Sequence, residues 1–158
     1  MINRTEWVSA LSTQASDKLL AITTALSCDW TISPKSLPQS GLGMLKLNDS
    51  AFEEPFYLGE FPLASAWLEI KTADGTIAQG AAQVMDDRVE IAEALAICDA
   101  VLAAKLPGWE KIADLLEQGM ASREATRRER KQMLASTRVD FSLLDEVDDK
   151  VKDHNAES

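Results

Sequence analysis

Two segments joined by a tight turn constrain the fold more than any other feature of the sequence. Residues 56–72 end in an alternation of apolar and polar side chains, which is the period of a strand with one buried face. Asp74-Gly75 follows, a dipeptide typical of β-hairpin turns. Residues 76–85 can return antiparallel, with Gly80 leaving a flat surface on which a helix can lie close. The chain is therefore expected to form a hairpin with one face to cover.

The segments before and after this hairpin have apolar residues at helical spacing. Residues 5–27 are predicted to be helical, with a break near 13–15. After the hairpin a helix is expected from Asp86-Asp87, with apolar residues at i, i+4, i+7 and i+11, and it ends at Pro107-Gly108. A further helix starts near Trp109, and within it Gly119 is expected to cap or kink the chain. The apolar residues of these two helices are Ile91, Leu95, Cys98, Leu102, Ile112, Leu116 and Met120.

The segment before the hairpin is predicted to be extended but mostly irregular. Pro34 and Pro38 interrupt residues 30–47, and proline is rare inside central strands, so only a short strand near 44–47 is expected. The predicted fold is α+β, an antiparallel sheet of three to four strands covered by helices, with an extended C-terminal arm. We expect residues 1–134 to form one domain, and 135–158 a docking arm with a disordered acidic tail.

Composition excludes several classes of function. The 158 residues carry a net charge of −10, which disfavours nucleic-acid binding. No apolar run approaches the ~20 residues that span a bilayer, and the N-terminus does not resemble a signal peptide, so a cytoplasmic location is expected. Cys28 and Cys98 are expected to be buried packing residues, and no metal or cofactor site is predicted. The single histidine, His154, lies in the tail, so no catalytic device is predicted in this chain alone.

The charged candidates each have two interpretations. Arg123, Arg127 and Lys131 (or Arg130) share one helical face that could hold phosphate groups or an acidic partner; the alternative is a solvated helix with internal pairs such as Glu124–Arg128. Glu60 is either an interface carboxylate or a strand residue facing water, and the second interpretation is favoured. Asp99 has the same two interpretations, and again the water-facing one is favoured.

The C-terminal arm is expected to bind a partner. It carries apolar and charged side chains on a segment with no core of its own, and exposed anchors of this kind mark docking sites. The residues concerned are Arg138, Val139, Asp140, Phe141 and Leu144.

An ordered set of short motifs resembles the PhnG family. Residues 135–141 read A-S-T-R-V-D-F, residues 56–60 read F-Y-L-G-E, and residues 74–76 read D-G-T. The segment 38–44 and the helix 92–100 also match in order. Two positions depart from the family pattern: Ala64-Ser65 stands where Thr-Arg is usual, and residues 85–88 replace Gly-Arg-Asp, with Arg88 as the candidate phosphate contact.

The resemblance implies a function that spacing alone does not. It implies an accessory subunit of the carbon–phosphorus lyase core complex, with PhnI, PhnH and PhnJ as partners. PhnG, PhnH and PhnI, helped by PhnL, transfer a phosphonate to C1′ of ATP ribose and release adenine, so ATP and an alkylphosphonate would be ligands of the complex. The alternative is a non-catalytic assembly or scaffold paralogue that keeps only the docking surfaces. In isolation, a homodimer that buries the arm is expected.

Overall fold

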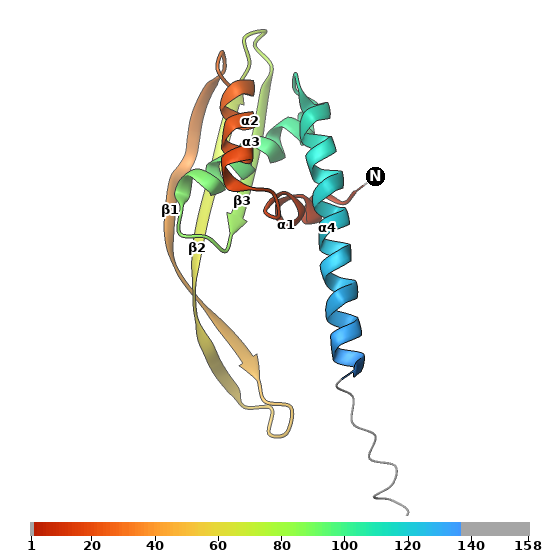
Figure 1. The fold of residues 1–158 in the computed structure, drawn as a ribbon. Coiled ribbons are helices and arrows are strands. Elements are labelled where there is room, and N and C mark those ends of the chain that lie inside the picture. The colour runs from red at the N-terminus through yellow and green to blue at the C-terminus, as the bar shows by residue number, and fades with distance from the viewer. Residues whose placement is uncertain (1, 137–158) are drawn as a thin grey trace, which may run out of the picture. The chain divides into compact units, whose positions relative to one another are not determined.

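The computed structural model describes residues 2–136, which form a three-stranded antiparallel sheet and four α-helices (Figure 1). The sheet has the order β1-β2-β3, so each strand pairs with its neighbour in sequence. This is the predicted α+β class. The elements in chain order are η1 Arg4–Glu6, α1 Trp7–Leu11, α2 Ser16–Leu26, β1 Thr31–Asn48, β2 Pro55–Lys71, β3 Ile77–Val84, α3 Val89–Ala104 and α4 Trp109–Ser136.

The hairpin expected from Asp74-Gly75 joins β2 to β3. Gly75 has a φ of 87°, and the Thr72 backbone N–H donates to the Thr76 carbonyl at 3.0 Å. Along the second half of β2, alternate side chains are buried, so the period-2 pattern correctly indicated the covered face. The buried residues are Ala64, Ala66, Leu68 and Ile70.

The prediction of only a short strand near 44–47 was wrong, because β1 runs for 18 residues, Thr31–Asn48. Its register against β2 shifts between Pro34 and Ser36 and again between Ser36 and Gln39. β1 is an edge strand, and bulges on an edge strand are where proline is tolerated within a sheet. The two prolines therefore bend the strand without ending it.

The first two strands extend well beyond the third. β3 pairs only with residues 64–71 of β2, whereas β1 pairs with β2 from Lys71 to Pro55. Residues 41–63, here called the distal hairpin, are therefore a two-stranded ribbon. It is the orange-to-yellow hairpin that continues past the end of β3 in Figure 1.

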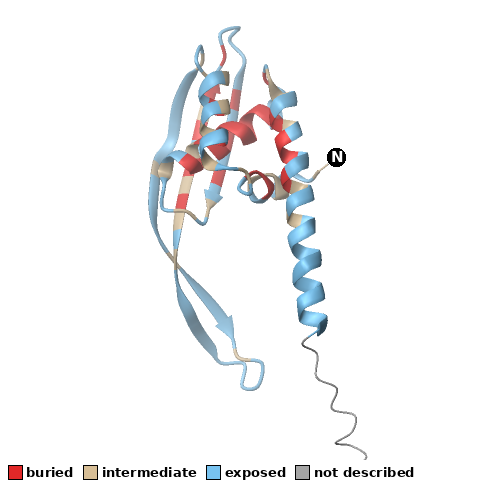
Figure 2. Ribbon diagram, in the orientation of Figure 1, coloured by how far each residue is buried: buried red, intermediate tan, exposed pale blue. Residues whose placement is uncertain are grey.

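Helix α3 is the centre of the core. Eleven of its sixteen residues are buried (Figure 2), so it is covered on several sides rather than along one stripe. A Cβ built on Gly80 would lie 2.0 Å from the Ala96 carbonyl oxygen, so β3 and α3 approach closely at this glycine, as the sequence indicated. The helix begins at Val89 rather than at Asp86-Asp87, since the Asp86 carboxylate accepts the Arg88 backbone N–H before the first turn.

The N-terminal helices and the first half of α4 complete the core. Leu11, Leu19, Ile112 and Leu116 are buried with the residues of α3 in one apolar cluster. Gly119 does not cap α4, because the helix continues through it to Ser136. A Cβ at Gly119 would lie 2.2 Å from the Ala10 carbonyl oxygen, so the residue permits a close approach between α1 and α4.

The chain divides into two compact units, one ending at Arg123 and one beginning at Glu124. Within the second unit, the described residues 124–136 are all exposed. None of the helices in residues 2–136 combines the length and the apolar character needed to cross a membrane.

Candidate functional site

The distal hairpin exposes an unusual amount of apolar surface. Eight of the fifteen large apolar side chains that are exposed among residues 2–136 lie in it, with exposed fractions from 38% for Leu47 to 79% for Phe52. Figure 2 shows this ribbon in the colour of exposed residues along nearly its whole length. The eight are Leu42, Met44, Leu45, Leu47, Phe52, Phe56, Tyr57 and Leu58.

Both faces of the distal hairpin carry these side chains. Directly opposed residues on paired strands share a face, and successive residues along a strand alternate between faces. Leu47 pairs with Phe56 on one face, and Leu42 pairs with Pro62 on the other. On the first face the Phe61 ring lies over Gly43, where a Cβ would be 2.7 Å from the ring. The ribbon is therefore apolar on two sides rather than amphipathic.

Glu60 belongs to the distal hairpin, opposite Met44, and is exposed. This is the environment expected for a strand residue that faces water. The Phe56–Glu60 segment that carries part of the family resemblance thus lies wholly on the exposed ribbon.

The loop at the end of the distal hairpin is acidic. Asp49, Glu53 and Glu54 lie within six residues of one another, and the apolar ring of Phe52 lies between them in sequence. The Asp49 carboxylate accepts the Ala51 N–H at 2.7 Å, and Glu53 adopts a φ of 55°, which closes the turn. Lys46 is the only cation of residues 41–63, against four carboxylates.

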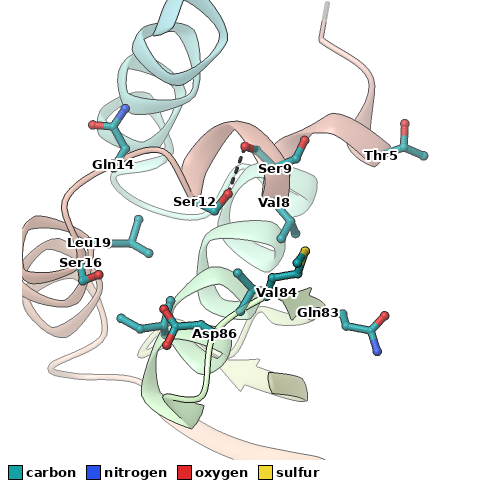
Figure 3. Close-up of a pocket in the computed structure, with 12 residues that line it drawn as sticks. Thr5, Val8, Ser9, Ser12, Gln14, Ser16, Leu19, Gln83, Val84 and Asp86 are labelled. Carbon is teal, nitrogen blue, oxygen red and sulfur yellow. Dashed lines mark hydrogen bonds between the residues drawn. The ribbon is translucent and has the colours of Figure 1, made fainter. Parts of the chain in front are cut away.

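A second candidate is a cavity of about 450 Å³ between the N-terminal helices and the end of β3. Figure 3 shows the hydroxyl and amide groups that line it, with the Ser12 hydroxyl donating to the Ser9 carbonyl at 3.1 Å. The charged side chain in its lining is Asp86, and none of its lining residues, all of them described, is a cation. The cavity therefore suits a neutral hydrogen-bonding group better than a phosphate. Its polar lining consists of Thr5, Ser9, Ser12, Gln14, Ser16, Gln83 and Asp86.

Arg88 lies beside this cavity, and its guanidinium is already paired with a carboxylate of the same chain. Its guanidinium donates to both Asp86 oxygens, at 2.9 and 2.7 Å, and to the Ser16 hydroxyl at 3.0 Å. The pairing holds the pKa of Asp86 well below its usual range and raises that of Arg88. A phosphate ligand would have to compete with Asp86 for this cation, so a phosphate contact by Arg88 stays a prediction.

The water-facing interpretation of Asp99 was wrong, because this carboxylate is buried. It accepts two hydrogen bonds from the Arg4 guanidinium, at 2.8 and 2.7 Å, and a third from the Ala81 backbone N–H at 3.0 Å. The ion pair raises the pKa of Arg4. Asp99 therefore joins η1, β3 and α3, and its role is structural.

The basic face of α4 has the expected helical spacing. Arg127 and Lys131 are exposed, whereas Arg123 is half-buried with its guanidinium 3.9 Å from the Met120 sulfur. The expected Glu124–Arg128 pair forms at 3.4 Å on an exposed surface, where such pairs contribute little to stability. Binding by this face, to phosphate or to a partner, stays a prediction.

The docking-arm residues Arg138, Val139, Asp140, Phe141 and Leu144 lie outside the described residues. Their role stays a prediction.

The expectation that both cysteines are buried holds for one of them. Cys98 is fully buried in α3, and burial raises the pKa of its thiol to about 12. Cys28 is exposed, because it lies after the end of α2 rather than on a packed face. Among residues 2–136, no group of three or more side chains is placed to hold a metal ion.

Comparison with known proteins identifies the chain's family. The family model described as "Phosphonate metabolism protein PhnG" matches residues 2–145, which is nearly the whole sequence. The chain belongs to the PhnG family. PhnG proteins belong to the carbon–phosphorus lyase complex, so this chain has a role in phosphonate metabolism. No curated protein matched the sequence.

The exposed apolar surface of the distal hairpin was not predicted from the sequence, although a signal was present. Residues 41–63 hold apolar side chains at consecutive positions, such as Met44-Leu45 and Phe56-Tyr57-Leu58, rather than at every second one. A strand with one solvated face alternates. Loss of alternation in residues 41–63 therefore indicated that both faces of this ribbon carry apolar side chains.

Proposed function

We propose that this PhnG chain is an accessory subunit of the carbon–phosphorus lyase core complex. In that complex it supports the transfer of a phosphonate to C1′ of ATP ribose with release of adenine. Its partners there would be PhnI, PhnH and PhnJ, with ATP and an alkylphosphonate as ligands of the assembly. The observation that carries this proposal is the family match over residues 2–145.

The surface of the chain supports a role in an assembly. The distal hairpin holds eight exposed apolar side chains, and contiguous exposed apolar surface marks sites of protein association. The cavity beside Arg88 is lined by apolar side chains, hydroxyls, amides and a carboxylate, with no cation, which is poor chemistry for binding a triphosphate. Both features favour a chain that shapes or holds another subunit's active site.

A second candidate is an assembly or scaffold paralogue that keeps only the docking surfaces. Two observations favour it over a subunit that touches substrate. Ala64-Ser65 brings no cation to the sheet where the family usually has Thr-Arg, and the Arg88 guanidinium is bound to Asp86. The two candidates differ in whether catalysis requires this chain.

Co-purification followed by an activity assay tests the proposal. Tagged chain is co-expressed with PhnI, PhnH and PhnJ of the same organism, and adenine release is measured from ATP with methylphosphonate in the presence of PhnL. The matched control is the same set of subunits expressed without this chain.

A stable complex whose phosphonate-dependent adenine release falls at least 10-fold without this chain would establish the subunit role. A stable complex with equal activity in its absence would favour the scaffold. If the folded chain binds none of the subunits, both candidates are wrong.

A further inference from the structure

We infer that the distal hairpin, residues 41–63, inserts into an apolar groove with a basic rim on a partner protein. The inference deepens the proposed function, because it assigns that groove to another subunit of the assembly. It concerns described residues of the first unit, and it is independent of the C-terminal arm.

Among residues 2–136, no third strand pairs with the distal hairpin. β3 ends its pairing at Ala64, and residues 55–60 of β2 are all exposed. A two-stranded ribbon is only marginally stable in water, and three strands or a covering helix are normally needed. If the ribbon is held in one conformation, the strand or surface that supports it must therefore lie outside residues 2–136.

The distribution of apolar side chains specifies a groove rather than a flat surface. Leu45, Leu47 and Phe56 lie on one face, while Leu42, Met44 and Tyr57 lie on the other. A flat partner surface would cover one set and leave the second in water. Two walls are needed to bury both, since opposite faces of a strand cannot contact one plane.

The open edge of the ribbon supports the same conclusion. From Pro55 to Leu63, β2 has no second neighbouring strand among the described residues. Unpaired N–H and C=O groups on an exposed edge invite pairing with another chain, and proteins normally cover such edges. A groove can supply backbone partners along this edge as well as apolar walls.

Charge selects the kind of partner. The distal hairpin holds four carboxylates and one lysine, and three of the carboxylates are at its end, around Phe52. A rim of lysine or arginine at the far end of the groove would complement this end of the hairpin and steer association. A second copy of this chain carries a net charge of −10, and an anionic membrane surface is also negative, so neither complements the acidic end of the hairpin.

The experiment measures binding of the full chain to the preassembled partner subunits by calorimetry. Phe56→Ser tests one face of the ribbon and Met44→Ser tests the other. Leu37→Ser is the matched control, because Leu37 is an exposed apolar residue of the same strand outside the distal hairpin. The double variant Glu53→Lys/Glu54→Lys tests the acidic end.

We expect Phe56→Ser and Met44→Ser each to raise the Kd by about 10-fold or more, which is typical for an apolar anchor at an interface. Leu37→Ser should leave the Kd unchanged. The charge-reversal variant should raise the Kd and weaken its dependence on salt. All four variants should melt within about 2 °C of the wild type, because these side chains are exposed.

Different results would contradict the proposed function and the inference about the hairpin. If the wild-type chain does not bind the subunits at all, the proposed function is wrong. If the wild type binds and the hairpin variants bind equally well, the inference is overturned while the proposed function stands. A loss with Phe56→Ser but not with Met44→Ser would overturn the two-walled groove. If light scattering shows that the wild type is a dimer and that Phe56→Ser is a monomer, the hairpin binds a second copy of this chain, and the inference of a partner subunit is overturned.

Discussion

Asp99 shows how one buried carboxylate connects distant parts of the chain. It binds the guanidinium of Arg4, 95 residues earlier, and the backbone N–H of Ala81 on β3. Three charge-assisted hydrogen bonds satisfy its oxygens, which is the condition under which a buried charge is tolerated. The N-terminal turn is thereby fixed to the centre of the core.

Removing this carboxylate should destabilise the fold. Asp99→Ala leaves the Ala81 N–H without its partner and Arg4 without its counter-ion, so we expect a loss of about 2–4 kcal/mol in the free energy of unfolding. Urea denaturation measures it. The control is Glu69→Ala, which removes a solvent-exposed pair with Lys35 and a hydrogen bond from Gln79, and its loss of stability should be much smaller. Equal losses for the two variants would contradict the structural role of Asp99.

The sequence offered little basis for predicting this contact. Asp99 occurs at the expected place on an apolar helix, but its partners come from η1 and from the backbone of β3. A carboxylate in a helix is most often solvated, and only the packing of three elements reverses that expectation. The prediction that Cys28 is buried failed for the opposite reason. Its neighbours in sequence are apolar, but they do not determine which side chains near the end of a helix are exposed.

At the scale of elements, two glycines set the distance between packed layers. Gly80 brings β3 against Ala96 and Ala100 of α3, and Gly119 brings α4 against the Ala10 carbonyl of α1. In each case the atom nearest to an added Cβ belongs to backbone, which cannot move aside as the end of a side chain can. Neither role depends on unusual backbone angles; each depends on the absence of a side chain.

A methyl group at these positions should be costly. Gly80→Ala would place its Cβ 2.0 Å from the Ala96 oxygen, and we expect a loss of about 2–4 kcal/mol, at or above the usual range for overpacking. Gly119→Ala should behave similarly. Gly41→Ala is the matched control, because no atom lies within 4 Å of the added Cβ, and its stability should change by less than about 0.5 kcal/mol. Thermal and urea unfolding of the three variants measures these losses. Equal losses at Gly41 and Gly80 would show that the destabilisation comes from replacing glycine itself and not from the short contact distance.

Element prediction succeeded where periodicity and turn chemistry agreed. The alternation in β2, the Asp74-Gly75 turn and the apolar positions of α3 each specified an element that the structure contains. Prediction failed for β1, because Pro34 and Pro38 were taken, from local sequence alone, to interrupt the strand. On an edge strand the donor that proline lacks is not needed, and only the tertiary arrangement shows that β1 is such a strand.

At the scale of the whole molecule, the fold should lose stability in acid. Pairing with Arg88 lowers the pKa of Asp86, and hydrogen bonds lower those of Glu69 and Asp74. A carboxyl group whose pKa is lower in the folded than in the unfolded state adds stability above its unfolded pKa of about 4, and that stability is lost as the pH falls.

Asp86→Asn isolates the largest of these contributions. At pH 7 we expect it to lower the Tm by about 2–4 °C, the scale of one partly exposed ion pair. The difference from wild type should shrink as the pH falls from about 4 toward 2. Arg88→Gln should have a similar effect, with little further loss in the double variant, since both remove one interaction. A Tm difference that persists unchanged at low pH would show that the pair is not its source.

The candidate docking surface was less predictable than the fold. The C-terminal arm and the basic face of α4 were selected because each segment lacks an apolar pattern that would give it a core of its own. The distal hairpin escaped notice because strands in a sheet are assumed to be covered by the same chain. β3 ends at Val84, so it does not reach residues 55–63 of β2. No local pattern in the sequence of β2 indicates how long β3 is.

The contacts of the N-terminal segment also bear on the order in which a growing chain can acquire its structure. Arg4 binds Asp99, and the Gln14 amide donates to the Leu115 carbonyl, so both partners emerge from the ribosome about a hundred residues later. The three strands pair only with sequence neighbours and can associate before that point. The contacts of Arg4 and Gln14 can therefore form only after residues 99 and 115 have been synthesised, and until then the apolar side chains of α1 and α2 lack the core in which they are buried.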